Sequence, residues 1–337
     1  MIYLNSNQNP LGPSPNAMAA IKAALSECHH YPDSQASELK NKLAERHSVL
    51  PEQVLIGAGS TELISTIARS LLGRGGTAIT SELSFVVYST AARAAGGQLV
   101  QVPMRQHGFD LEALAAAANG STQITFLANP NNPTGTVFDA RRADDFLARV
   151  PEHVTVIFDE AYYEYAEAFA RERKLAYSHS LDYVRQRRNV IVLRTFSKVY
   201  GLAGLRIAYA LGPPALLARF ARVRSVYSIS GPAQAAAVAA LDDQVHVRET
   251  LANNRAGAKW LGEELSGLGF NPLPTWANFL YVETAGNGEM FAERLKGEGV
   301  AVRPLADWGA PKAIRVTIGT PEQNRALLAA LRKILRQ

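Results

Sequence analysis

The feature that most constrains this chain is a regular alternation of short apolar segments with helical segments, which begins at Val54. Helical patterns at 60–72, 85–95, 110–118 and 139–149 separate the first of the apolar segments. The predicted strands are Val54–Ile56, Thr77–Thr80, Leu99–Val102, Ile124–Leu127, Val154–Phe158, Val190–Leu193 and Leu205–Leu211. This alternation predicts an α/β fold with a mainly parallel seven-stranded sheet sandwiched by helices.

The pattern changes after Gly212. Residues 213–268 have an almost wholly helical pattern, and the tail then alternates between strands and helices. The tail strands are expected near 277–282, 300–302 and 313–318, and its helices at 287–297 and 320–335. The first 15 residues are rich in Asn and Pro, which predicts an irregular arm. We therefore expect a large domain over 30–245 and a smaller α+β domain, with the arm, from 1–29 and 246–337.

Composition excludes several classes of protein. Hydrophobic residues make up 47% of the 337 residues and charged residues 19%, which fits a globular enzyme and argues against disorder. The net charge of +5 comes from scattered Lys and Arg without a basic block. We therefore expect small anionic ligands and no nucleic acid. The N-terminus lacks a signal-peptide pattern, and no stretch of about 18 apolar residues occurs, which predicts a cytoplasmic protein without a membrane span.

The histidines and the cysteine do not form a metal-binding pattern. Cys28 is the one cysteine, so an intramolecular disulfide and a multi-thiolate metal site are both excluded. The seven histidines have no H-E-x-x-H or similar spacing. The sequence predicts no metal site.

The segment Gly57-Ala58-Gly59-Ser60-Thr61-Glu62 directly follows the first predicted strand and begins a helix. Glycines allow close approach of a ligand, and the free N–H groups of a helix N-terminus attract phosphate. The segment fits a single phosphate group. It also fits a dinucleotide, with Glu82 as the ribose-binding acid, although Glu62 stands where that fingerprint has its third glycine. A capped helix without a ligand is the third interpretation.

Polar residues follow three further strands, at the edge where open α/β sheets bind ligands. The rigid turn 129–135 follows Ile124–Leu127, and its Asn side chains offer donors and acceptors. Asp159 follows a wholly apolar strand, so its carboxylate needs a cation, either an Arg or a metal. Lys198 follows another apolar strand, and a desolvated lysine becomes a nucleophile towards carbonyls. Arg206 opens an apolar strand, a costly position unless the side chain binds an anion.

These features occur in order on successive strands, and together they match what pyridoxal phosphate requires. That cofactor needs an amine for its aldehyde, a carboxylate for its ring nitrogen, a donor for its phenolic oxygen and an anion site for its phosphate. The sequence therefore predicts a pyridoxal 5'-phosphate site.

With these motifs the chain resembles the fold-type I pyridoxal-phosphate aminotransferases of the histidinol-phosphate aminotransferase group. The resemblance runs nearly end to end and implies an aspartate aminotransferase-like fold. It rests on an ordered set of segments: Asn7-Gln8-Asn9-Pro10-Leu11-Gly12-Pro13, Tyr31-Pro32-Asp33, Gly59-Ser60-Thr61-Glu62, Asn131-Asn132-Pro133-Thr134-Gly135, Asp159-Glu160-Ala161-Tyr162, Thr195-Phe196-Ser197-Lys198, Gly201-Leu202-Ala203-Gly204-Leu205-Arg206, Ala277-Asn278-Phe279 and Ile314-Arg315-Val316-Thr317.

The resemblance also implies roles for single residues. Lys198 would bind the cofactor covalently as an aldimine and move the proton, and Asp159 would pair with the ring nitrogen. Asn132 and Tyr162 would bind the phenolic oxygen. The implied cofactor-binding set is Gly59, Ser60, Thr61, Phe85, Asn132, Asp159, Tyr162, Thr195, Ser197, Lys198, Arg206 and, from the partner subunit of a homodimer, Tyr31. Arg315, Arg303 and Asn7 would contact the substrate.

The implied activity is amino transfer to 2-oxoglutarate from histidinol phosphate or an aromatic amino acid. A pyridoxal-phosphate lyase similar to threonine-phosphate decarboxylase is the first alternative, because such relatives share the arm, the lysine and the arginines. A nicotinamide-dependent dehydrogenase is a remote alternative that leaves Lys198, Asp159 and Asn132 without roles. A ligand-binding regulator on this fold would carry an added DNA-binding domain, for which 337 residues leave no room.

Overall fold

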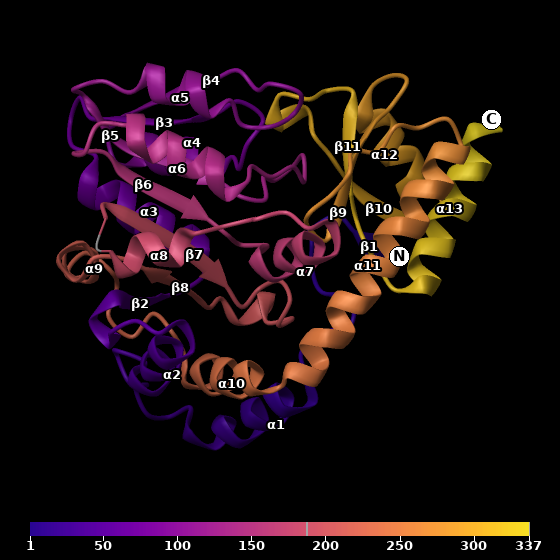
Figure 1. The fold of residues 1–337 in the computed structure, drawn as a ribbon. Coiled ribbons are helices and arrows are strands. Elements are labelled where there is room, and N and C mark those ends of the chain that lie inside the picture. Colours follow the sequence, from indigo (N-terminus) through magenta and orange to yellow (C-terminus); the bar gives the residue numbers. More distant parts are fainter. Residues whose placement is uncertain (187, 337) are drawn as a thin grey trace.

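The computed structural model describes residues 1–186 and 188–336. Over these residues the chain forms two sheets, which lie side by side in Figure 1. The larger sheet has seven strands, as the sequence predicts. In spatial order these are β2 (Val54–Gly57), β8 (Ala208–Leu211), β7 (Val190–Thr195), β6 (Thr155–Asp159), β5 (Thr122–Ala128), β3 (Thr77–Ser81) and β4 (Gln98–Val102).

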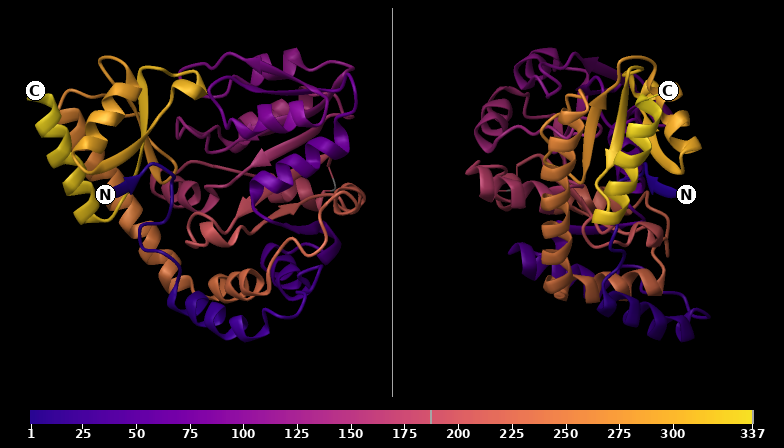
Figure 2. Two further views of the ribbon diagram at one scale, coloured as in Figure 1. Left: turned by 180° about the vertical axis from the view of Figure 1, so that it is seen from behind. Right: turned by 90° about the vertical axis from the view of Figure 1, so that its right-hand side faces the viewer.

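The larger sheet is parallel except for β8, which runs antiparallel to both of its neighbours. Strands β5, β6 and β7 are buried along almost their whole length, because helices cover both faces of the sheet (Figures 1 and 2). The helices around it are α2 (Ser37–His47), α3 (Ser60–Leu71), α4 (Val87–Ala94), α5 (Leu111–Ala117), α6 (Ala140–Arg149), α7 (Tyr163–Arg173), α8 (Ser180–Arg185), α9 (Pro214–Ala221) and α10 (Gly231–Asp242). This architecture confirms the predicted fold class.

The smaller sheet has its own apolar core. Its strands, in spatial order, are β1 (Ile2–Leu4), β10 (Val300–Pro304), β11 (Ala313–Thr317) and β9 (Phe279–Glu283). Helices α12 (Gly288–Gly297) and α13 (Pro321–Leu335) cover it. Leu4, Leu265, Leu280 and Leu331 belong to this second core, which is separate from the core of the larger sheet.

The N-terminal arm differs from its prediction. Residues 2–4 are not irregular but form β1, which pairs in parallel with β10 from Ile2 opposite Val300 to Leu4 opposite Val302. The apolar residues of this segment gain a partner strand only from the far end of the chain, so local sequence does not reveal it. Arm residues 5–14 then lead into α1 (Pro15–Ala24), which packs on α10.

Two segments join the parts of the fold. The long helix α11 (Gln244–Gly267) runs from the end of α10 to the smaller sheet (Figure 1). The short turns η1 (Leu25–Glu27), η2 (Pro51–Gln53), η3 (Ala203–Leu205) and η4 (Ala306–Trp308) complete the elements. The two cores support the proposed division into two domains, although α1, placed with the small domain from sequence, contributes Ala17 to the larger core. The exact boundaries stay a proposal.

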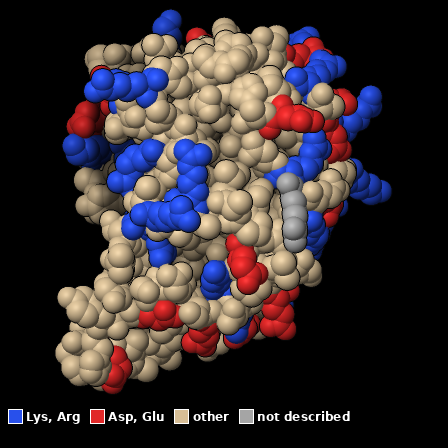
Figure 3. Space-filling view, turned by 90° about the vertical axis from the view of Figure 1, so that its left-hand side faces the viewer, with Lys and Arg blue, Asp and Glu red and all other residues tan. Residues whose placement is uncertain are grey.

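The surface carries charges of both signs. On the face shown in Figure 3, one group of Lys and Arg side chains lies among uncharged residues, and acidic side chains lie around it. The expectation that the chain does not bind nucleic acid stays a prediction. In the described residues, no helix combines the length and the apolar character that crossing a membrane requires.

Candidate active site

A cavity lies at the carboxyl edge of the larger sheet, next to the smaller sheet. The strand order explains why residues distant in sequence meet there. Because β2, β3, β5, β6 and β7 run in the same direction, the segments that follow them share one edge. Strand β8 runs the other way, so the segment that precedes it reaches the same edge. The cavity is lined by Ser6, Gln8, Ser60, Thr61, Phe85, Tyr88, Ala128, Pro130, Asn132, Asp159, Ala161, Tyr162, Thr195, Ser197, Lys198, Ala203 and Arg206.

Lys198 follows β7 and its amine points to the arm. Its Nζ donates to the backbone oxygen of Asn7 at 3.3 Å and lies 3.5 Å from that of Ser6. Burial, together with the positive charges of Arg315 and Arg206, lowers the pKa of Lys198 to about 7, although the negative charge of Asp159 acts in the opposite direction. A substantial neutral fraction of this amine therefore exists near neutral pH, which is the state that attacks a carbonyl carbon.

Asp159 is the last residue of β6 and is 5% exposed. Its Oδ2 accepts a hydrogen bond from the Tyr88 hydroxyl at 2.7 Å, and its Oδ1 accepts one from the Ala161 N–H at 3.3 Å. Burial raises the pKa of this carboxyl to about 6, while the two hydrogen bonds oppose the rise. The carboxylate lines the cavity without a cationic hydrogen-bond partner among the described residues, so it can accept a proton-bearing ligand atom.

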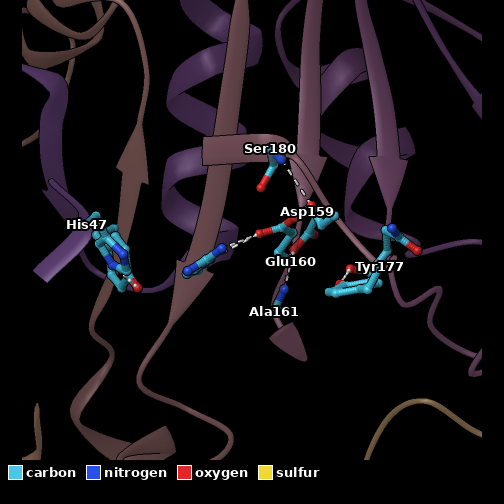
Figure 4. A network of polar contacts seen from close by, with 10 residues as sticks. His47, Asp159, Glu160, Ala161, Tyr177 and Ser180 are labelled. Atoms are coloured by element: carbon cyan, nitrogen blue, oxygen red, sulfur yellow. Dashed lines mark hydrogen bonds and ion pairs between the residues drawn. The ribbon is translucent and has the colours of Figure 1, made fainter. Parts of the chain in front are cut away.

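The neighbouring residue Glu160 points away from the cavity. Figure 4 shows Asp159 and Glu160 at the end of one strand, with the Glu160 carboxylate directed to the next strand. There it pairs with the Arg194 guanidinium, at 2.8 Å from Nη2 and 3.0 Å from Nε, and both side chains are buried. Because Arg194 immediately precedes Thr195 on β7, this ion pair joins the two strand ends that carry Asp159 and Lys198.

Asn7 and Tyr162 form a connected polar pair beside Lys198, whereas Asn132 is hydrogen-bonded to Arg315. The Asn7 side chain donates to the Tyr162 hydroxyl at 2.9 Å, and Thr317 accepts from the Asn7 backbone N–H at 2.9 Å. Asn7 is 1% exposed and adopts a left-handed backbone conformation, with φ of 55°. Contacts from Lys198, from Thr317 on β11 and from Tyr162 at the start of α7 thus bring this arm residue into the site.

One end of the cavity is suited to an anion. Ser60 and Thr61 begin α3, whose first N–H groups are free of a capping side chain because the preceding residue is Gly59. A Cβ atom on Gly59 would lie 2.3 Å from Nη2 of Arg206, so glycine makes room for that guanidinium. Nη1 of Arg206 lies 3.5 Å from the Ser197 hydroxyl. The hydroxyl of Ser197 in turn accepts from Thr195 at 3.0 Å.

The prediction for the backbone at Arg206 was wrong. The residue does not open a strand but follows the turn η3 in a left-handed conformation, with φ of 53°, and β8 begins at Ala208. Its side chain is exposed at the cavity rather than buried in the sheet. The need for an anion therefore comes from the convergence of donors and not from burial in an apolar strand.

Arg315 lies on β11 of the smaller sheet and is 4% exposed. Nη1 donates to Oδ1 of Asn132 at 2.5 Å and Nη2 donates to the backbone oxygen of Asn5 at 2.9 Å. Its Nε is buried and has no hydrogen-bond partner among the residues that the structure describes. Burial lowers the pKa of Arg315 to about 10, which leaves it charged at neutral pH. A buried cation that meets no carboxylate in the described part of the chain, next to a cavity, is suited to an anionic ligand.

Two predicted residues lie outside this group. Arg303 on β10 is exposed and reaches the arm only through Nε, 3.4 Å from the Asn5 oxygen. Tyr31 is 82% exposed and does not line the cavity of its own chain. Its ring stacks on Tyr227 with centroids 4.7 Å apart.

Sequence reasoning missed Tyr88, the Glu160–Arg194 ion pair and the arm carbonyl groups. Tyr88 is on α4 and comes three residues after Phe85, close to one helical turn. This spacing is the one signal that could have placed Tyr88 in the site. Arg194 is an arginine inside an otherwise apolar strand, which signals a buried acidic partner but not which one. Backbone carbonyl groups leave no trace in sequence.

The chain is similar to known aminotransferases along almost its whole length. The family model for aminotransferase class I and II matches residues 1–331. Histidinol-phosphate aminotransferase 2 of Pseudomonas aeruginosa is 44% identical over 99% of this chain and 89% of its own length. The enzyme of the same name from Carboxydothermus hydrogenoformans is 40% identical over 98% of this chain and 90% of its own length.

Solved structures show the same fold. The histidinol-phosphate aminotransferase of Sinorhizobium meliloti, in complex with pyridoxal-5'-phosphate, superposes with a TM-score of 0.88 at 30% identity, covering 99% of this chain and 90% of that one. The aspartate aminotransferase of Thermus thermophilus with maleate gives a TM-score of 0.87 at 25% identity, covering 99% and 91%.

The residues at the cavity fit the cofactor that the Sinorhizobium meliloti enzyme binds. The amine of Lys198, the carboxylate of Asp159 and the donors around Arg206 occupy one cavity, and they supply the groups that pyridoxal phosphate needs. In the part of the chain described, no group of three or more His, Cys, Asp or Glu side chains is placed to hold a metal ion. This chain belongs to the class I and II aminotransferases and, within them, to the histidinol-phosphate aminotransferase group of pyridoxal-phosphate enzymes.

Proposed function

We propose that this aminotransferase moves the amino group of histidinol phosphate to 2-oxoglutarate. The observation that carries the proposal is the buried Arg315 guanidinium, whose Nε has no partner among the described residues. An arginine fork can hold a phosphate or a carboxylate through parallel hydrogen bonds. One arginine can thus serve histidinol phosphate in one half-reaction and 2-oxoglutarate in the other. The relatives named as histidinol-phosphate aminotransferases support the choice of donor.

The surroundings of Arg315 support a substrate with a flat ring. The guanidinium carbon lies 5.6 Å from the Trp308 ring centroid and 5.4 Å from that of Phe279. Trp308 also lies near Phe85, with ring centroids 6.1 Å apart. An imidazole would find aromatic surface there, and so would the ring of an aromatic amino acid, which is therefore the second candidate donor.

The proposed roles of the other residues follow from their positions. When bound, pyridoxal phosphate withdraws electrons from the Cα atom of the amino donor. Lys198 would hold the cofactor and then carry the proton to and from that Cα, a task that suits an amine with a pKa near 7. Asp159 would keep the ring nitrogen protonated, because an ionised carboxylate stabilises a neighbouring cation. Asn132 and Tyr162 would bind the phenolic oxygen, with Asn7 holding the Tyr162 hydroxyl.

The phosphate of the cofactor would lie at the start of α3, where it would meet Ser60, Thr61, Ser197 and Arg206. Thr195 and Gly59 would support these phosphate-binding groups indirectly, since Thr195 donates to Ser197 and Gly59 leaves room for Arg206. Phe85 would stack on the ring.

We also propose that the enzyme is a homodimer in which Tyr31 completes the site of the partner. The exposed, stacked pair of Tyr31 and Tyr227 supports this, as does the exposed side chain of Val226, the residue directly before Tyr227. Large exposed apolar side chains that cluster on one face are typical of an interface. A cytoplasmic location is also part of this proposal.

A donor panel tests the proposal. Purified enzyme loaded with pyridoxal phosphate is given 2-oxoglutarate and, in separate reactions, histidinol phosphate, phenylalanine, tyrosine or threonine phosphate, and glutamate formation is measured. We expect the highest kcat/KM with histidinol phosphate. Preference for phenylalanine or tyrosine would reassign the donor. Release of carbon dioxide from threonine phosphate without glutamate would support the lyase alternative.

A further inference from the structure

Tyr88 contacts both Phe85, which is proposed to stack on the cofactor ring, and Asp159, which is proposed to pair with the ring nitrogen. It is on α4, fully buried, and its ring stacks on Phe126 of β5 with centroids 4.6 Å apart and planes only 4° from parallel. The same ring meets Phe85 edge-on, at 5.7 Å and 88°. These two aromatic contacts therefore fix the direction of its hydroxyl group, which points to the end of β6.

The Tyr88 hydroxyl donates to Oδ2 of Asp159 at 2.7 Å. Burial keeps the phenol protonated by raising its pKa well above 10, so it acts as the donor. The Ala161 N–H holds the other oxygen of Asp159 at 3.3 Å. Two donors on two different oxygens fix the plane of the carboxylate, and both favour its ionised form.

We propose that Tyr88 is a positioning residue, whose hydroxyl keeps the Asp159 carboxylate ionised and in one orientation for the ring nitrogen of pyridoxal phosphate. The inference depends on the proposed function only through the role of Asp159, and it does not depend on which amino donor is used. It assigns a task to a buried hydroxyl group that neither the phosphate site nor the substrate site employs.

The charges around Asp159 show why this hydrogen bond matters. Burial and the negative charge of Glu160 favour the neutral acid, whereas the Lys198 ammonium favours the carboxylate. Glu160 is itself neutralised by its ion pair with Arg194. Lys198 has a pKa near 7 and so gives little support once its amine is neutral. The hydrogen bond from Tyr88 is the largest influence that favours the charged form of Asp159.

The test measures cofactor affinity rather than turnover. Apoenzyme is titrated with pyridoxal phosphate at a series of pH values, with visible absorbance and protein fluorescence as readouts. We expect Tyr88→Phe to raise Kd at neutral pH roughly 10- to 100-fold, the range for a hydrogen bond to a charged group. Affinity should also be lost at higher pH than in the unchanged protein, because Asp159 then takes up its proton more readily.

Tyr183→Phe is the matched control, because Tyr183 is also buried and also donates to an aspartate, Asp144, which lies on α6 away from the cavity. Its Kd and pH profile should match those of the unchanged protein. In an Asp159→Asn background, Tyr88→Phe should have no further effect on Kd, since the proposed action passes through that carboxylate.

Equal Kd values for Tyr88→Phe and Tyr183→Phe, with an unshifted pH profile, would overturn the proposal. An undiminished effect in the Asp159→Asn background would do the same. If Tyr88→Phe does not fold, 3-fluorotyrosine at position 88 serves instead, since its more acidic hydroxyl is a stronger donor. It should move the loss of affinity to lower pH, and an unchanged profile would count against Tyr88. If the donor panel identifies a donor other than histidinol phosphate, these measurements still test the role of Tyr88, because they follow cofactor binding and not the amino donor.

Discussion

Replacing Arg315 by lysine tests the substrate site most directly. The change keeps a positive charge on β11 but removes the planar fork. In the structure Nη1 and Nη2 are engaged by Asn132 and Asn5, and Nε is buried without a partner among the described residues. A lysine amine cannot satisfy the Asn132 oxygen, the Asn5 oxygen and a two-oxygen anion with the same geometry.

The expected cost follows from burial. Arg315 is 4% exposed, so a substrate anion that meets it is largely removed from water. Weakening one partner of such a buried, hydrogen-bonded charge pair costs roughly 2–4 kcal/mol, which is about 30- to 1,000-fold in affinity. Both substrates should lose affinity together, because both present an anion to the same guanidinium.

The assay is steady-state kinetics with each substrate varied in turn, beside visible absorbance of the bound cofactor. Absorbance should persist in Arg315→Lys, because the proposed phosphate site contains Arg206 instead. Arg303→Lys is the control: its side chain is exposed and makes one long contact to Asn5, so its effect should stay within about 1 kcal/mol. If Arg315→Lys loses the cofactor, or leaves both substrates unaffected, the reasoning is wrong and Arg303 becomes the better candidate.

Three further predictions concern the cofactor site. Lys198→Ala should abolish borohydride-trappable cofactor. Between the native pKa of Lys198 of about 7 and its ordinary pKa of 10.5, the unfolded chain binds more protons than the cofactor-free native protein, so native stability should rise with pH across that window. Thermal unfolding at a series of pH values should show that this rise is lost in the variant. Asp159→Asn should keep the fold, as judged by circular dichroism, but lose roughly 10²- to 10⁴-fold in kcat, and near-normal turnover would make Asp159 structural. Mixed dimers of Tyr31→Phe and Lys198→Ala subunits should regain activity, because one of their two sites is intact, and verified hybrids without activity would contradict a role of Tyr31 across the interface.

Much of the larger domain could be predicted from sequence because its signals are local. Apolar strands of β-branched residues alternate with helical patterns, and the polar residue after each strand stands out against them. Lys198, Asp159 and Asn132 were recognisable for this reason, and so was their common edge, since parallel strands end on the same side of a sheet.

The remaining features depend on contacts between distant segments, which local sequence does not encode. Residues 2–4 become a strand only because β10, nearly 300 positions later, offers an edge to pair with. Arg206 takes its conformation from the turn before β8 and not from the apolar residues after it. The hydroxyl of Tyr88 gains its function from Asp159, 71 residues away. Composition and periodicity determined most elements of the larger domain and the polar residues that follow its strands, whereas only tertiary packing decided the strand β1 and which side chains meet, because hydrogen bonds and burial depend on distances in space.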